Sequence, residues 1–109
     1  MKKREMKIQF NTDKNVIGSK ELIASATSLI SEELSRFSQQ ITRVEVHLSD
    51  EDGNKDGFID KRCMLEARLA GMKPIAVTHH ANTHEQAIDG AIDKLKASLE
   101  KITGRLKDY

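Results

Sequence analysis

The second half of the chain, residues 61–106, constrains the fold most, because two strand patterns lead there directly into a capped helix. Apolar and polar residues alternate over 61–71, and a second extended run covers 75–80. Alternation of this kind is typical of strands that bury one face. Thr83 and Gln86 then have the spacing of a capping box, and apolar residues recur at helical spacing to the end of the region. We therefore expect a hairpin followed by an amphipathic helix.

The first half adds a strand, a helix and another strand. Residues 6–10 and 41–49 alternate like half-buried strands. Between them, Ser19 can cap a helix whose apolar positions repeat as far as Phe37. The order is β-α-β-β-β-α, and each strand has one polar face and each helix one apolar stripe. This pattern predicts an α+β two-layer sandwich, with both helices on one face of an open sheet.

The length of 109 residues leaves room for a single domain, residues 1–109. Aromatic residues make up only 4% of the chain, so its core must be aliphatic. Gly90 falls inside the last helix, where glycine costs about 1 kcal/mol relative to alanine unless close packing requires it. The positions expected in the core are Leu22, Ala26, Leu29, Ile30, Leu34, Phe37, Val44, Val46, Leu48, Cys63, Leu65, Ala67, Leu69, Ala87, Ile88, Ala91, Ile92, Leu95, Leu99 and Ile102.

Composition indicates a soluble cytoplasmic protein. Hydrophobic residues make up 38% and charged residues 32%, which argues against disorder. The basic N-terminal segment is not followed by an apolar run of signal or membrane length. The single cysteine, Cys63, cannot form an internal disulfide, which favours a reducing compartment.

Residues 52–60 resemble the first nine positions of an EF-hand calcium loop. Oxygen ligands fall at the first, third, fifth and ninth positions, and glycine at the sixth. The twelfth position, which should supply a bidentate glutamate, is Cys63, and the flanking segments alternate like strands instead of forming helices. We expect an acidic turn there without calcium binding.

Neither the histidines nor the cysteine form a recognisable catalytic or metal site. His79 and His80 are adjacent on a strand and should point to opposite faces, so they cannot easily share a metal with each other. His84 could join one of them, but a structural zinc site needs four ligands, and Cys63 is a weak candidate for another. Cys63 shares its strand face with apolar residues, which makes it a packing residue and not a nucleophile. We expect no enzyme activity, catalytic residues, metal, cofactor or small-molecule substrate.

The charge is segregated along the chain although the net charge is only +1. Residues 94–109 carry five cationic side chains against two carboxylates, and residues 50–60 carry five carboxylates against one lysine. Ammonium and guanidinium groups suit phosphate oxygens, and helical RNA is recognised mainly through its shape and backbone. We therefore expect an RNA-binding surface on the last helix, made by Lys94, Lys96, Lys101 and Arg105, with Lys94, Lys101 and Arg105 in one basic stripe beside its buried face. Arg62 and Arg68, which should project from the sheet face away from the helices, and Lys73 in the adjoining turn should assist, and folding should make these cations converge on one surface.

Four segments have a characteristic order and spacing. They are Val-Glu-Val-His-Leu at 44–48, Cys-Met-Leu-Glu-Ala-Arg at 63–68, Ala-Val-Thr-His-His at 76–80, and 86–95, which ends in Asp-Lys-Leu. Together these segments resemble the ribosome hibernation-promoting factor family, also called ribosome-associated inhibitors or sigma-54 modulation proteins. The resemblance spans about residues 7–105, and Lys94 and Lys101 match basic helix positions of the family.

The resemblance implies a domain similar to double-stranded RNA-binding domains. It also implies binding in the mRNA and tRNA channel of the small ribosomal subunit, which blocks translation and stores inactive ribosomes during stress or stationary phase. On this resemblance we expect a short form, without the additional C-terminal domain of the long members, and we expect a monomer or weak dimer without membrane contacts. The alternative is a non-ribosomal protein-interaction regulator on the same fold, which the near-neutral charge favours.

Overall fold

The computed structural model describes residues 6–12, 20–50 and 61–107, with the side chains of Thr12 and of residues 103–107 left out. The observed order of elements is β-α-β-β-β-α, which confirms the predicted order. The elements are β1 (Lys7–Thr12), α1 (Lys20–Glu33), a 3-10 turn (Ser35–Phe37), β2 (Ile41–Asp50), β3 (Lys61–Leu69), β4 (Ile75–Ala81) and α2 (His84–Lys107).

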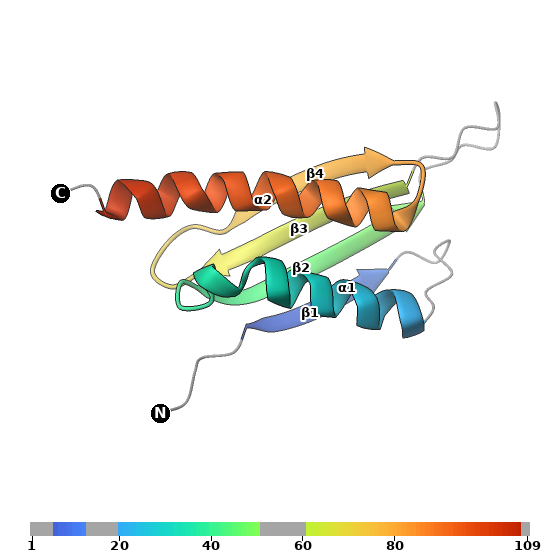
Figure 1. Ribbon diagram of the computed structural model, residues 1–109, viewed down its shortest axis with the longest axis horizontal. Coiled ribbons are helices and arrows are strands. Elements are labelled where there is room, and N and C mark those ends of the chain that lie inside the picture. The colour runs from blue at the N-terminus through green and yellow to red at the C-terminus, as the bar shows by residue number, and fades with distance from the viewer. Residues whose placement is uncertain (1–5, 13–19, 51–60, 108–109) are drawn as a thin grey trace.

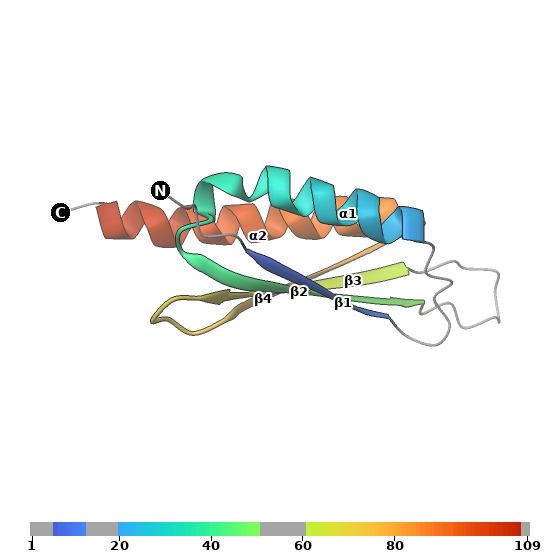
Figure 2. The same cartoon turned by 90° about the horizontal axis from the view of Figure 1, so that it is seen from below.

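The molecule has two layers, a four-stranded sheet and a pair of helices. The strands lie in the order β1-β2-β3-β4, with β1 parallel to β2 and the other neighbours antiparallel. Figure 2 shows both helices on the same side of this sheet, as the sequence predicted. In Figure 1, α2 runs along β3 and β4, whereas α1 lies toward β1. In Figure 2, neither of the two described helices covers the opposite face of the sheet, which we call the open face.

The connections explain this topology. The segment that contains α1 joins β1 to β2, and a helical crossover is the usual way to bring two strands side by side in parallel. The remaining strands follow one another as antiparallel neighbours. Across their helix-facing side, Val46 lies opposite Leu65, and Leu65 lies opposite Val77. The alternation of each strand therefore places one apolar row beneath the helices.

The core is aliphatic and lies between the two layers. Its buried members on the sheet come from β2 and β3, whereas β4 contributes partly buried side chains. Of the positions expected in the core, all are buried except Leu22, Leu29 and Ile102, which pack against it while partly exposed. Cys63 is fully buried among these residues.

The first helix is shorter than its apolar pattern suggested. Its α-helical part ends at Glu33, and a 3-10 turn carries the chain onward to Phe37. The Phe37 amide donates to the Leu34 carbonyl at 2.9 Å, a bond three residues apart that tightens the chain before β2. Phe37 still reaches the core, which explains why the apolar spacing extends past the helix. The expected cap, Ser19, lies outside the described residues.

The second helix begins and packs as its sequence indicated. The Gln86 amide donates to Thr83 Oγ1 at 3.1 Å, which is the N-cap bond of the predicted capping box. At Gly90, a Cβ atom would lie 2.1 Å from Cδ2 of the His79 ring on β4. Close packing against this imidazole therefore accounts for a glycine inside the helix.

None of the helices in the described ranges has both the length and the apolar content needed to cross a bilayer. The calcium-loop-like segment, residues 52–60, lies outside the part of the chain that the structure describes, so the prediction of an acidic turn there remains a prediction.

Candidate nucleic-acid interface

Two of the predicted RNA-binding lysines lie on the side of α2 that faces the edge strand β4. The Lys94 Nζ donates a 2.8 Å hydrogen bond to the Thr78 carbonyl of β4. Lys101, two turns further along, is exposed and has no ion pair with any residue that the structure describes. Because residues seven apart share a helix face, these two ammonium groups form one stripe, as expected.

Lys96 lies on the other side of the same helix. Its Nζ is 2.9 Å from Glu33 Oε1, so it joins α2 to α1. A second ion pair, Arg36 with Glu100, links the same region to α2 further along. The charge of Lys96 is therefore compensated within the protein.

Arg105 belongs to the last turns of α2, but its side chain is not described. Its membership of the basic stripe therefore stays a prediction.

Arg62 and Arg68 lie on the open face of the sheet, and Lys73 lies in the turn between β3 and β4. Alternation along β3 turns both arginines away from the buried side chains of the same strand. The guanidinium of Arg68 is 3.8 Å from Glu45 Oε2, and half of the side chain is exposed. Lys73 is exposed two residues after Gly71, whose φ of 71° lies in the left-handed region that glycine adopts readily.

The expectation of one convergent basic surface is therefore not met by the described side chains. The lysines of α2 are in the helix layer, whereas Arg62 and Arg68 project from the opposite side of the sheet. The reason is geometric, because alternation on β3 sends every second residue away from the helices. Lys94 and Lys101 lie on the β4-facing side of α2, and Lys96 lies on the side that faces α1. Arg62 and Arg68 lie on the open sheet face, and Lys73 lies in the turn between β3 and β4.

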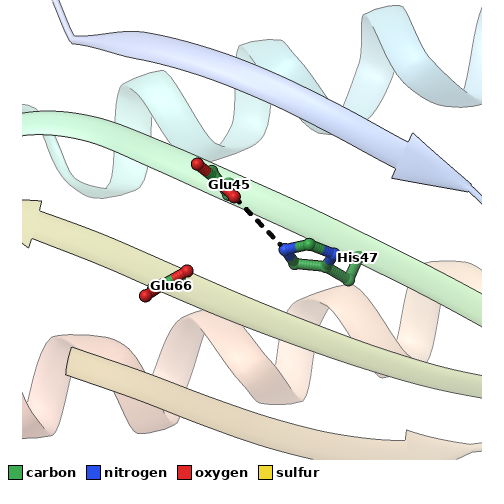
Figure 3. Close-up of side chains that lie close together, drawn as sticks. All are labelled: Glu45, His47 and Glu66. Atoms are coloured by element: carbon green, nitrogen blue, oxygen red, sulfur yellow. Dashed lines mark ion pairs between the residues drawn. The ribbon is translucent and has the colours of Figure 1, made fainter. Parts of the chain in front are cut away.

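The open face also carries acidic groups that the sequence analysis did not single out. Glu45 and His47 of β2 and Glu66 of β3 point toward one another there (Figure 3). Arg43 is 3.1 Å from Glu45 Oε2. The sequence does hold part of the signal, since Glu45 and His47 are two residues apart on a strand. The missing part is the register that places Glu66 opposite Glu45.

Cys63 and His79 behave as packing residues, whereas His80 is exposed and His84 is partly buried. Burial raises the pKa of Cys63 to about 12, so its thiol stays protonated at neutral pH. His79 turns inward against Gly90 and His80 is exposed, which confirms that the neighbours point to opposite faces. Desolvation lowers the pKa of His84, which is partly buried at the start of α2.

Similar solved structures share this architecture. The N-terminal domain of Protein Y from Thermus thermophilus superposes with a TM-score of 0.71 at 18% sequence identity, covering 89% of this chain and 99% of that one. A ribosomal subunit interface protein from Coxiella burnetii gives a TM-score of 0.68 at 20% identity, covering 91% and 99%. At such identities, the likeness demonstrates the fold.

Sequence comparison is more decisive about ancestry. No curated protein matches the chain. The family described as sigma 54 modulation protein / S30EA ribosomal protein, in contrast, matches over residues 9–107, which is almost all of the sequence. On this match, and in agreement with its β-α-β-β-β-α fold, the chain belongs to the sigma 54 modulation protein / S30EA ribosomal protein family.

Proposed function

We propose that the protein binds the small ribosomal subunit, occupies the channel used by mRNA and tRNA, and keeps ribosomes inactive under stress. The family match over residues 9–107 carries this proposal. One of the similar structures is itself named a ribosomal subunit interface protein. Inhibition by this route is steric and needs no catalytic residue, cofactor or small-molecule substrate.

Lys94 and Lys101 are the best-placed phosphate contacts. Both are exposed, and they share one side of α2 beside β4. Arg105, four residues after Lys101 in the sequence, is proposed as a further contact of the same stripe. Lys96 can join only by leaving Glu33, so its contribution is smaller. Arg62, Arg68 and Lys73 assist from the open face and the adjoining turn.

The direct test is co-sedimentation of the purified protein with small ribosomal subunits at several salt concentrations. If about six phosphates are contacted, the logarithm of the affinity should fall against the logarithm of salt with a slope of roughly −4 to −5. Absence from the subunit peak at low salt would contradict the proposal. A pull-down that recovers one protein partner and no ribosomal RNA would favour the protein-interaction alternative instead.

A further inference from the structure

Three side chains of metal-binding type converge on the open face of the sheet. Glu45, His47 and Glu66 each offer one ligand atom, and these atoms all lie within 4.8 Å of one another. Figure 3 shows the imidazole of His47 directed toward Glu45, with Glu66 extending from the neighbouring strand. We refer to these three residues as the carboxylate–histidine cluster.

We propose that the carboxylate–histidine cluster binds one Zn²⁺ ion. Glu45 Oε1, His47 Nε2 and one carboxylate oxygen of Glu66 would be the protein ligands, and water would fill the fourth position. Zinc accepts this mixture of imidazole and carboxylate ligands in tetrahedral geometry, and three protein ligands with one open position are common. Ca²⁺ and Mg²⁺ prefer oxygen ligands, so an imidazole nitrogen among three protein ligands favours zinc over these ions.

The spacing of the first two ligands already suits a shared ion. His47 Nε2 and Glu45 Oε1 are 3.5 Å apart, which exceeds the usual length of an N–H···O hydrogen bond. Two ligands at zinc bond lengths of about 2.0–2.2 Å lie about 3.3–3.6 Å apart at a tetrahedral angle. A zinc ion can therefore enter between these atoms with little movement of either side chain.

The electrostatics of the cluster favour a cation. Glu45 and Glu66 lie directly opposite each other in the β2–β3 register, and like charges at such positions destabilise a sheet. Arg43 and Arg68 compensate Glu45 only, at 3.1 and 3.8 Å from its Oε2 atom. Glu66 has no ion pair with any of the described residues. Among the residues that the structure describes, the Glu66 carboxylate thus has no cation paired directly with it.

The scaffold holds the ligands in place. Strands β2 and β3 are the two inner strands of the sheet, so each is hydrogen bonded on both sides. The side chain of Glu45 is only 13% exposed, and its Oε2 atom is held by the arginines while Oε1 faces His47. Partners on the second oxygen of a ligating carboxylate orient it for a metal. The same arginines repel a cation, which limits the affinity.

The test uses the full chain after treatment with a chelator, titrated with ZnCl₂ alone and followed by calorimetry and thermal melting. We expect one Zn²⁺ per chain and a melting temperature that rises by roughly 10 °C at a hundredfold excess of zinc over Kd. Glu66→Gln should weaken binding at least about tenfold, since even residues that only orient a ligand are worth 10–100-fold. His47→Gln should weaken it similarly, while MgCl₂ and CaCl₂ should have no effect.

Three matched variants separate this site from others. Glu85→Gln makes the same change as Glu66→Gln at an exposed position on α2, and His80→Gln removes an exposed histidine from β4. Asp52→Asn with Asp56→Asn alters the acidic segment between β2 and β3. All three should bind zinc like the unaltered chain. No zinc binding by the unaltered chain, or unchanged binding in both Glu66→Gln and His47→Gln, would overturn the proposal. Because these zinc-binding measurements contain no ribosomes, their outcome is independent of the proposed function.

Discussion

At the scale of single residues, burial decides the chemistry of the thiol. Cys63 is fully buried in the core, and its pKa is raised to about 12, so hardly any thiolate exists at pH 8. We expect iodoacetamide to modify the native protein far more slowly than the urea-unfolded protein at that pH. Mass spectrometry of timed samples measures both rates. Equal rates would mean that the β3 core opens readily.

Gly90 is a second position where one atom matters. A Cβ there would meet Cδ2, Nε2 and Cγ of the His79 ring, all within 2.5 Å. The whole ring would have to move, so Gly90→Ala should destabilise the protein by roughly 1–3 kcal/mol despite the better helix propensity of alanine.

The control for this prediction removes the ring. In the double variant His79→Ala with Gly90→Ala, the alanine at 90 should no longer be penalised relative to His79→Ala alone. Urea unfolding midpoints of the four proteins complete the cycle. If Gly90→Ala is more stable than the unaltered chain, the imidazole moves aside freely.

Sequence patterns predicted the burial of most residues but few of their polar partners. Alternation along the strands sufficed to predict that Cys63 faces the core and that His79 and His80 point in opposite directions. Both features depend on local backbone geometry alone. The pairing of Lys96 with Glu33 depends on how α2 lies beside α1. No local pattern specifies that arrangement.

At the scale of elements, a partly exposed ion pair joins α2 to α1. It links Lys96 to Glu33, and both side chains are about a third exposed. Exposed pairs contribute about 0.2–1 kcal/mol, so Lys96→Ala should lower the free energy of unfolding by less than 1 kcal/mol. Urea unfolding measures this. A larger loss would show that the pair is needed to dock α1, and would make Lys96 unsuitable for testing ribosome binding.

The order of the elements was predictable, whereas the strand register was not. Periods of two and of 3.6 residues separated strands from helices, and the capping box fixed the start of α2 within a residue. The register of β2 against β3 cannot be obtained in that way, since ten residues, 51–60, separate the two strands. That register creates the carboxylate–histidine cluster, so sequence patterns alone could not predict the cluster.

At the scale of the whole molecule, exposed lysines lie at both edges of the sheet. Lys94 and Lys101 lie on α2 beside β4, whereas Lys7 and Lys20 belong to β1 and α1, and β1 and β4 are the opposite edges of the sheet. If the β4 side contacts ribosomal RNA, reversing charge there should affect binding much more than reversing it at the β1 side. Net charge alone would make both changes equivalent.

The test therefore compares two double variants that change the net charge by the same amount. Lys94→Glu with Lys101→Glu should abolish co-sedimentation with small subunits, because two phosphate contacts become repulsions. Its melting temperature should stay nearly unchanged, since both side chains are exposed and only the Lys94 bond to Thr78 is lost. Lys7→Glu with Lys20→Glu should still co-sediment. An equal loss of co-sedimentation in both variants would indicate non-specific electrostatic attraction. Retained binding by the Lys94→Glu, Lys101→Glu variant would indicate that the contact surface is the open face of the sheet.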